Sequence, residues 1–257
     1  MPELPDLQVF SRNLTKALKG KKIDKIVCHS KKLNVPVEDL QDALEGAELT
    51  KVERAGKELH FSFDNKHVLG LHLMLHGQLT LSKEEEEEES KSLIIALKFE
   101  DDRILSLTDF DGLAAPTLDP KANNIPDALE VTAGYLGEKL SKTRTPVKNV
   151  LMDQKVVRGI GNAYADEILW DARLSPFSAS NKIPAEKVKQ LTASIKKVLE
   201  DAEKQILKAR PEIISGEYRD FMEVHNARKK KTSTGVEILQ KPIASRKTYY
   251  TEEQEEY

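Results

Sequence analysis

Residues 151–167 read LMDQKVVRGIGNAYADE, and this stretch decides how the rest of the chain is interpreted. Apolar residues at helical spacing extend across both of its ends, at 147–153 and again at 163–172. The two helical segments are separated by a four-residue turn, Arg158-Gly159-Ile160-Gly161. The pattern predicts two helices that meet at a glycine-containing turn.

The turn is followed by Asn162, and its composition suits contact with a phosphate. Glycine lets a backbone approach a ligand closely, and N–H groups at the start of the second helix would face that ligand. Lys155 lies one turn before Arg158 and adds positive charge. A dinucleotide-binding glycine loop follows a strand, whereas this turn follows a helix, so that interpretation fails. We expect Lys155, Gly161 and Asn162 to contact phosphates; glycines used only for packing are the alternative.

The net charge of -3 conceals an asymmetry along the 257 residues. Lys and Arg number 40 against 43 Asp and Glu, which excludes a uniformly basic nucleic-acid coat protein. Residues 1–140 carry -8 and residues 141–257 carry +5. The last seven residues alone carry -4, so residues 141–250 carry +9. This basic stretch predicts a polyanion-binding face in the C-terminal part.

Cysteine content and hydropathy restrict the class of protein. The single cysteine, Cys28, excludes an internal disulfide and a cysteine-cluster zinc site. The start MPELPDLQVF lacks the basic and apolar regions of a secretory signal, and no run of 18 apolar residues predicts a membrane span. We expect a cytoplasmic (bacterial) or nucleoid-associated protein without membrane contact.

Periodicity divides the chain into segments of different secondary structure. A helix is predicted at 5–18, where apolar residues recur every three or four positions. Strands are predicted from short apolar runs at 23–27, 59–63, 68–75, 93–99 and 104–107. Prolines and asparagines in 116–126 predict an interdomain linker. Helices follow, the longest at 184–208, and residues 221–250 become β-like again.

Six consecutive glutamates at 84–89 form a charge block between two predicted strands. Such blocks are typical of solvated loops, which is the expected state here. Protection of a sheet edge and binding of a partner are the alternatives.

The first candidate for catalysis is the start Met1-Pro2-Glu3. Met before Pro is normally trimmed, which would leave a secondary amine on Pro2. An α-amine loses its proton more readily than a lysine does, and a nearby helix N-terminus strengthens this effect. Such an amine can attack an aldehydic sugar carbon, and Glu3 can transfer protons. By itself this signal is weak, since many chains begin Met-Pro by chance.

Two further candidates are basic. Lys57 follows Gly56 at a predicted turn and could reach a phosphate; a solvated surface lysine is the alternative. The tail gathers basic residues and tyrosines that could fit a nucleic-acid backbone, unless it is merely solvated. These are Arg228, Lys229, Lys230, Lys231, Lys241, Arg246, Lys247, Tyr249 and Tyr250. His72 and His76 lie in a strand-like run without a third ligand, so we expect no metal.

Together these residues resemble the formamidopyrimidine-DNA glycosylase/endonuclease VIII family. The resemblance rests on the start Met-Pro-Glu-Leu-Pro, on Gly56-Lys57, on the run from His72 to Gly77 and on Thr108-Asp109. It is most specific over 151–167, which looks like the family's helix-two-turn-helix element almost residue for residue. It extends in order from residue 2 to about residue 250.

The resemblance implies an α+β fold in three parts. Residues 1–130 would form an N-terminal catalytic β-sandwich domain with flanking helices. Residues 131–222 would form the helical helix-two-turn-helix domain that binds DNA. Residues 223–257 would form a β-hairpin finger and tail. Damaged DNA is the implied partner of a monomer that needs no small-molecule cofactor.

The resemblance also implies a bifunctional DNA glycosylase and abasic-site lyase that excises oxidised bases. Pro2 would attack the sugar C1′ and form a Schiff base, and Glu3 would act as acid and base in ring opening. Lys57 would contact the DNA backbone beside the lesion. Lys155 and Asn162 would hold phosphates around a flipped nucleotide, and eliminations would then cleave the strand.

The finger departs from the common family pattern. Its usual zinc ligands are four cysteines, and Lys231, Thr234, Thr251 and Gln254 stand at those positions. The resemblance is therefore to the family's zincless finger, a hairpin that keeps its shape without metal. Arg246 stands at the position of the finger's phosphate-clamping arginine.

The residues that fill the space left by a flipped base also differ. The family uses a Met, an Arg and a Phe; Leu75 stands at the Met position and can still wedge into a base stack. Small, acidic or aliphatic residues replace the Arg and Phe within 110–114. An aspartate there cannot act as an arginine donor toward the opposite base. In addition, Asp6 stands where the family commonly has Glu, and we expect a modest effect.

Two other functions remain open from the sequence. The chain could be a non-catalytic damaged-DNA-binding relative, which the altered loop 110–114 favours and the intact Pro2, Glu3 and Lys57 oppose. It could also bind RNA or the ribosome, since a similar helix-two-turn-helix occurs in a small-subunit ribosomal protein. The N-terminal motifs would then have no role.

Overall fold

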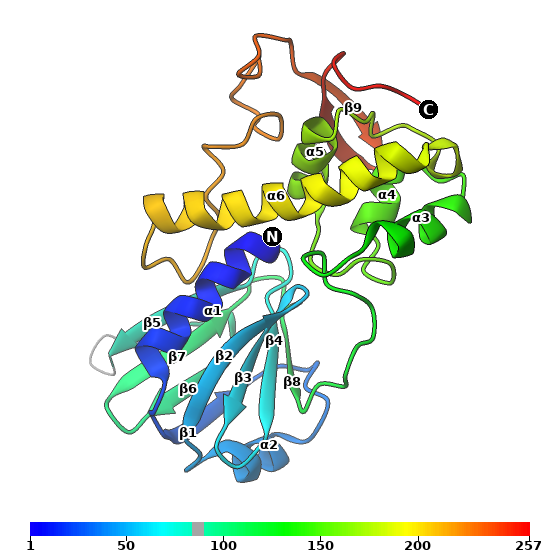
Figure 1. The fold of residues 1–257 in the computed structure, drawn as a ribbon. Coiled ribbons are helices and arrows are strands. Elements are labelled where there is room, and N and C mark those ends of the chain that lie inside the picture. The colour runs from blue at the N-terminus through cyan, green and yellow to red at the C-terminus, as the bar shows by residue number, and fades with distance from the viewer. Residues whose placement is uncertain (84–89) are drawn as a thin grey trace. The chain divides into compact units, whose positions relative to one another are not determined.

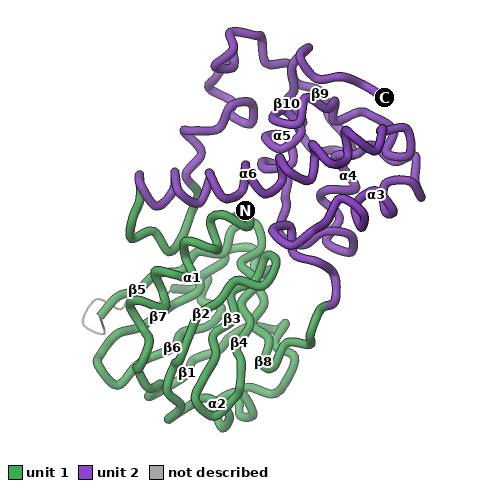
Figure 2. Tube along the Cα trace, in the orientation of Figure 1, with its two compact units in different colours: residues 1–123, 209–217 green, residues 124–208, 218–257 purple. Residues whose placement is uncertain are grey.

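The computed structural model describes residues 1–83 and 90–257, and the chain divides into two compact units (Figure 2). Unit 1 comprises residues 1–123 and 209–217. Unit 2 comprises residues 124–208 and 218–257. The segment 209–217 therefore joins the N-terminal unit from far along the sequence. The expected solvated loop at 84–89 lies outside the described residues.

Unit 1 is built from two four-stranded antiparallel sheets with helices beside them (Figure 1). One sheet has the order β1-β6-β7-β5 and the other has the order β2-β3-β4-β8. The helices are α1 (Leu4–Leu18) and α2 (Val37–Leu44). The strands are β1 (Ile23–Cys28), β2 (Leu49–Ala55), β3 (Glu58–Phe63), β4 (Val68–His72), β5 (Gln78–Lys83), β6 (Leu93–Phe99), β7 (Arg103–Thr108) and β8 (Ala115–Leu118). Apolar side chains of both sheets and of α1 share one core, which confirms the predicted sandwich.

Helix α1 confirms the helix predicted at 5–18 and begins one residue earlier. Its start is closed by a capping box, in which the Asp6 carboxylate accepts the Glu3 N–H at 2.9 Å and the Glu3 carboxylate accepts the Asp6 N–H. Such reciprocal bonds satisfy donors that a helix start otherwise leaves unpaired. Phe10 and Leu14 on the apolar face are completely buried. The helix therefore fixes Glu3 at its first turn.

Several elements of unit 1 were not predicted, and one prediction was partly wrong. Strand β8 occupies the beginning of the linker predicted at 116–126. Pro116 pairs with Leu71 at the edge of its sheet, where a proline removes no hydrogen bond from a further strand. In β2 a register shift between Leu49 and Lys51 interrupts the alternation that would have indicated a strand. Helix α2 was also missed, as was α3 (Ala133–Ser141) in unit 2.

Unit 2 combines helices with a two-stranded hairpin. Helices α4 (Val147–Met152) and α5 (Asn162–Asp171) confirm the two helices predicted around the glycine turn. A short 3-10 helix, η2 (Ser180–Lys182), precedes α6 (Ala185–Ala209), which confirms the long amphipathic helix. In the tail, strands β9 (Leu239–Ile243) and β10 (Arg246–Tyr250) pair antiparallel. The two residues between them both have positive φ, which matches the twist of a tight hairpin.

A completely buried ion pair joins the hairpin to the helices of unit 2. The Lys148 ammonium on α4 lies 2.7 Å from Asp166 Oδ1 on α5, and both side chains are 0% exposed. Lys148 also donates to Thr248 Oγ1 at 2.8 Å. The other Asp166 oxygen contacts His225 Nδ1 at 2.7 Å and accepts the Tyr249 N–H at 3.0 Å. Strand β10 is therefore attached to α4 and α5 through charged groups that water does not reach.

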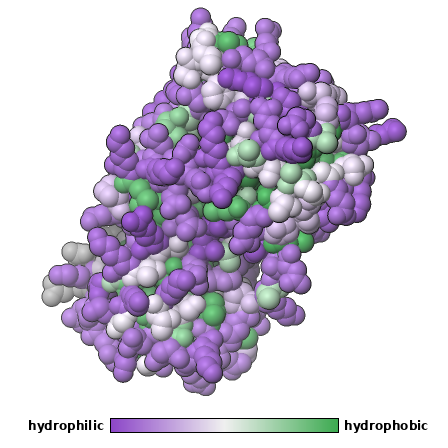
Figure 3. All heavy atoms as spheres, in the orientation of Figure 1, coloured by the Kyte–Doolittle hydropathy of each residue, from purple (hydrophilic) through white to green (hydrophobic). Residues whose placement is uncertain are grey.

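The face drawn in Figure 3 is dominated by hydrophilic residues, with hydrophobic ones in small separate areas. Within the described part of the chain, no helix has both the length and the hydropathy needed to cross a bilayer.

Replacement of Lys148 by methionine should destabilise unit 2 strongly. The substitution leaves Asp166 buried without its cationic partner, and breaking such a pair costs about 3–5 kcal/mol. The measurement is the free energy of unfolding in urea, followed by the fluorescence of Trp170, the chain's single tryptophan. Lys196→Met is the matched control, because Lys196 is 63% exposed and its pair with Glu200 spans 3.8 Å. Equal stability of the two variants would contradict the assigned role of Lys148.

Candidate functional site

The N-terminal end of unit 1 holds the first two candidate residues. Pro2 is buried, and the Glu3 side chain, which caps α1, is only 3% exposed. The amino group of Met1 forms an ion pair with the Glu217 carboxylate, which comes from the returning segment 209–217. A carboxylate from late in the chain therefore lies beside the chain's start. Because 216 residues separate the two partners, the sequence offered no signal for Glu217.

A hollow of about 550 Å³ is formed by the same returning segment. It is lined by Ala209, Arg210, Pro211, Glu212, Ile213, Ser215, Gly216 and Glu217. The segment is anchored at two points, where Asn13 donates to the Ile213 carbonyl at 2.8 Å and Leu79 N–H donates to Ser215 Oγ at 3.0 Å. Glu217 lines this hollow, and its carboxylate also forms the ion pair with the amino group of Met1.

Lys57 lies at the tip of the β2–β3 hairpin, in the predicted turn. Gly56 has a φ of 64°, which glycine adopts without strain. Arg54 ties this tip to α1, since its Nε donates to Gln8 Oε1 at 3.0 Å and its Nη1 donates to the Gly56 carbonyl at 3.1 Å. Arg54 thereby links the half-buried Lys57 to the helix that begins at Glu3. No sequence motif indicated a role for Arg54, although it lies three residues before Lys57.

His72 is the neighbour of this tip on the adjacent strand, opposite Glu58 in the β3–β4 pairing. Burial lowers the pKa of His72; the Glu58 carboxylate acts in the opposite direction and Lys57 adds a smaller lowering. Its Nδ1 accepts the Met74 N–H at 3.1 Å, so the uncharged ring helps to shape the chain that leads to Leu75. Leu75 itself is 57% exposed.

The glycine turn of unit 2 is organised by Gln154. Its amide donates to the Met152 carbonyl at 2.9 Å and to the Ile160 carbonyl at 2.8 Å, and its oxygen accepts the Gly159 N–H at 2.9 Å. Gly159 has a φ of 103°, a conformation that side chains disfavour. The turn leads directly into α5, and Gly161 is its N-cap. Gln154 lies within 151–167, but no local pattern there indicated this role.

The predicted phosphate contacts of unit 2 come from three short segments. Lys155 is exposed at the turn, and Arg246 is exposed at the first position of β10. Asn162, at the start of α5, donates from its amide nitrogen to the Lys247 carbonyl at 3.1 Å. This bond brings the helix start against the strand that carries Arg246. Asn162 and Lys247 on the finger strand are thus in contact, although 85 residues separate them in the sequence.

The finger is closed by hydrogen bonds to the carboxylate of Glu253. Its Oε2 accepts from Thr234 Oγ1 at 3.0 Å and from Thr251 Oγ1 at 3.4 Å. Trp170 Nε1 and Arg173 Nη1, from the end of α5 and the residues after it, donate to the same oxygen at 3.3 and 3.1 Å. One carboxylate oxygen therefore joins two parts of the finger to the helical part of unit 2.

The residues at the positions of the family's zinc ligands do not fit a zinc ion. Lys231, Thr234, Thr251 and Gln254 supply no thiolate or imidazole, the donors that structural zinc prefers. Gln254 is instead used internally, because its oxygen accepts the Thr251 N–H at 2.8 Å and its amide donates to the Leu174 carbonyl at 2.9 Å. Across residues 1–83 and 90–257 no group of three or more His, Cys, Asp or Glu residues could hold a metal ion.

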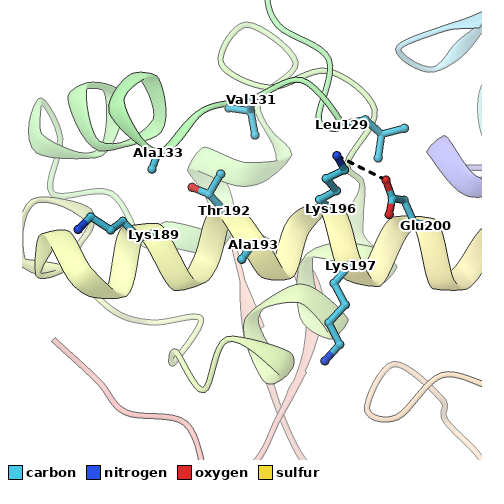
Figure 4. Close-up of a pocket in the computed structure, with 9 residues that line it drawn as sticks. All are labelled: Leu129, Val131, Ala133, Lys189, Thr192, Ala193, Lys196, Lys197 and Glu200. Atoms are coloured by element: carbon cyan, nitrogen blue, oxygen red, sulfur yellow. Dashed lines mark ion pairs between the residues drawn. The ribbon is translucent and has the colours of Figure 1, made fainter.

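A second hollow lies on unit 2 between α6 and the segment before α3 (Figure 4). Its lysines are engaged with acidic residues: Lys196 pairs with Glu200 at 3.8 Å, Lys197 with Asp171 at 2.6 Å and Lys189 with Glu186 at 3.2 Å. The hollow therefore has the character of a solvated helix flank. None of the candidate residues from the sequence lines it.

Comparison with protein-family models gives two matches that follow one another along the chain. Residues 1–115 match the formamidopyrimidine-DNA glycosylase N-terminal domain. Residues 124–209 match the formamidopyrimidine-DNA glycosylase H2TH domain.

Individual proteins agree with these matches. A formamidopyrimidine-DNA glycosylase of Chloroflexus aurantiacus is 32% identical over 215 residues, which cover 79% of this chain and 76% of that protein. One of Lactobacillus gasseri is 31% identical over 261 residues, which cover 94% and 93%.

Solved structures are similar over almost the whole chain. The Lactococcus lactis Fpg in complex with DNA containing an abasic site has a TM-score of 0.88 and 25% identity, covering 99% of this chain and 100% of that one. MutM in complex with DNA containing carbocyclic 8-oxo-G has the same TM-score, identity and coverage.

Replacement of Glu253 by alanine should loosen the finger. The variant removes the acceptor that four donors share, and a typical intramolecular hydrogen bond contributes about 0.5–1.5 kcal/mol. We expect faster amide hydrogen exchange in β9 and β10 and a changed emission of Trp170, which donates to Glu253.

Glu252→Ala is the matched control, since Glu252 is the exposed neighbour. A metal chelator should leave hydrogen exchange in the wild-type finger unchanged. Slow exchange in Glu253→Ala, or faster exchange on chelation, would refute the role of Glu253.

Proposed function

The chain belongs to the formamidopyrimidine-DNA glycosylase family and is a DNA glycosylase, and we propose that it excises oxidised bases and then cleaves the strand at the abasic site. The observation that carries the proposal is the pair of family matches over 1–115 and 124–209, which include every candidate residue except those of the tail, Arg246 among them. Structural neighbours in complex with abasic-site and 8-oxo-G DNA support damaged DNA as the partner. We propose that it acts as a monomer.

The proposed chemistry begins with the secondary amine of Pro2, once Met1 has been removed. The nitrogen attacks C1′ of the sugar, the bond from C1′ to the damaged base breaks, and the base leaves with a proton. Protonation of O4′ by Glu3 opens the sugar ring and leaves an iminium between Pro2 and C1′. Loss of a C2′ proton then expels the 3′ phosphate, and a second elimination expels the 5′ phosphate.

The geometry of unit 1 supports this assignment. The capping box holds Glu3 next to Pro2, and Arg54 holds the hairpin tip with Lys57 against α1. We propose that Lys57 binds a phosphate beside the lesion. The hollow beside the Met1 amino group is proposed to receive the extruded base, because such enzymes must take the nucleotide out of the stack to reach C1′.

The geometry of unit 2 supports phosphate binding. Helix α5 begins at Asn162, and the positive end of a helix dipole favours an anion. Lys155 in the glycine turn and Arg246 on β10 are exposed cations. We propose that the three segments follow the sugar-phosphate backbone and that the finger functions without zinc.

A non-catalytic relative that only binds damaged DNA is the second candidate. The loop 110–114 favours it, because Asp111 and Gly112 offer no cation toward the opposite base. The two candidates differ in one respect that can be measured, namely a covalent bond between the protein and an abasic site.

Borohydride should trap a covalent adduct between the protein and an oligonucleotide with one abasic site. Intact mass must first show that Met1 is absent from the protein used. We expect Pro2→Gly to lose most of the adduct and of base excision, by about 100-fold or more, which is within the range for loss of a positioned catalytic group. A form that retains Met1 should give no adduct.

Equal trapping by wild type and Pro2→Gly would remove the proline from the mechanism. Binding without any adduct would establish the non-catalytic candidate instead.

Arg246→Ala should weaken DNA binding about equally for all sequences. An arginine on a phosphate acts by charge, so its loss should also lower the slope of log affinity against log salt by about 1. Fluorescence anisotropy at several salt concentrations measures both effects. Lys204→Ala is the control, since Lys204 is 73% exposed on α6 and pairs with Asp201. The same salt slope in Arg246→Ala and wild type would exclude a phosphate contact.

A further inference from the structure

The ammonium group of Lys155 is free, whereas the backbone that carries it is fixed. Lys155 is exposed, and within the described part of the chain it forms no ion pair. Asp153 Oδ1 accepts the Lys155 N–H at 2.9 Å. The Asp153 carbonyl accepts the N–H groups of Val156 at 2.8 Å and Val157 at 3.0 Å. A cation on a fixed backbone loses less entropy when it binds an anion.

The end of this segment is bound to the chain that enters unit 2. Arg158 N–H donates to the Pro126 carbonyl at 3.0 Å, and Arg158 Nε donates to the Ile125 carbonyl at 2.7 Å. The Arg158 carbonyl in turn accepts the Ala128 N–H at 2.9 Å. Lys155 therefore lies in a short segment whose far end is held by three hydrogen bonds.

Tyr135 supplies the bond that reaches the middle of the segment. Its hydroxyl, on α3, donates to the Val156 carbonyl at 3.0 Å. Among the described residues, no other hydrogen bond joins 155–157 to a part of the chain outside 153–157. A side chain from another helix thus holds the residue that follows Lys155.

The place of Tyr135 is itself determined by α3. The hydroxyl of Thr132, the N-cap of the helix, accepts the Tyr135 N–H at 3.3 Å. Leu136, the next residue, is 0% exposed and fixes the helix on its apolar side. The Lys139 ammonium lies 5.2 Å from the centre of the Tyr135 ring, within the range of a cation–π interaction. The hydroxyl therefore reaches Val156 from a ring that is itself held in place.

We propose that Tyr135 is a positioning residue for the phosphate contact of Lys155. This inference rests on the proposed function, in which Lys155 binds the DNA backbone. Tyr135 acts through the Val156 carbonyl, because its bond limits the conformations of the segment that carries the lysine. A charge that is placed in advance binds its partner more tightly than one that must be ordered on binding.

A tyrosine that only stabilised the fold would have a different effect on DNA binding. Lower stability reduces the fraction of folded protein but leaves unchanged the number of phosphates that each folded molecule neutralises. The slope of log affinity against log salt reports that number. The salt slope therefore distinguishes a positioning role from a contribution to stability alone.

The first test is Tyr135→Phe, which removes the hydroxyl and keeps the ring. The probe is a duplex oligonucleotide with a stable abasic-site analogue, followed by fluorescence anisotropy at several salt concentrations. We expect the affinity to fall by about 3-fold to 10-fold, as for the loss of one hydrogen bond. The salt slope should move toward that of Lys155→Ala, which should lie about 1 below wild type. Tyr257→Phe is the matched control, since the Tyr257 hydroxyl bonds to Glu255 instead.

The DNA-free protein offers a local measurement of the same bond. Amide hydrogen exchange at 155–157 should be faster in Tyr135→Phe than in wild type, whereas exchange in the rest of α3 should not change. Equal exchange at 155–157 in the two proteins would show that the hydroxyl does not order the segment, and would overturn the proposal.

The double variant Tyr135→Phe/Lys155→Ala decides whether Tyr135 acts through Lys155. If it does, adding Tyr135→Phe to Lys155→Ala should change the affinity by less than about 2-fold. A loss as large as in the wild-type background, or a wild-type salt slope in Tyr135→Phe, would refute the positioning role alone. Wild-type affinity in Lys155→Ala would instead remove the proposed phosphate contact, and the inference with it.

Discussion

The burial of two adjacent carboxylates on α5 is the constraint on which unit 2 depends. Asp166 must have Lys148, His225 and the Tyr249 N–H around it, because an isolated buried charge is prohibitively unstable. Glu167 accepts N–H groups of three successive residues, 223–225; burial raises its pKa, and these bonds oppose that rise. The two acids thereby determine where the finger hairpin lies against the helix that follows the glycine turn.

The same principle explains how the finger keeps its shape. A zinc ion would join four ligands at one point, and here Glu253 joins Thr234, Thr251, Trp170 and Arg173 at one oxygen. Hydroxyl, indole and guanidinium donors are each directed at an acceptor, so the arrangement is specific although every bond is weak compared with a metal ligand. The acceptor is partly exposed, with 23% of the Glu253 side chain accessible, so the cluster depends on several bonds acting together.

Unit 1 positions its candidate residues by a different route, in which charged side chains bind backbone atoms. Asp6 binds the Glu3 N–H, Arg54 binds the Gly56 carbonyl and Asp109 binds three N–H groups of its loop. Each of these bonds sets the conformation of a short segment that presents a chemical group. Rigid segments of this kind reduce the entropy lost on binding. Arg54 in this way fixes the turn that carries the half-buried Lys57.

The sequence by itself determined the two helices around the glycine turn, helix α1, the sandwich strands with continuous apolar runs, and the family, because periodicity and motif spacing are local properties. It did not predict β8, since a proline is acceptable only at an edge that the sheet order defines. Nor did it indicate Glu217 beside Met1, the Glu253 hydrogen bonds or the hydrogen bond from Tyr135 to Val156. Those contacts join residues far apart in the chain, and only the folded structure decides which of many possible partners meet.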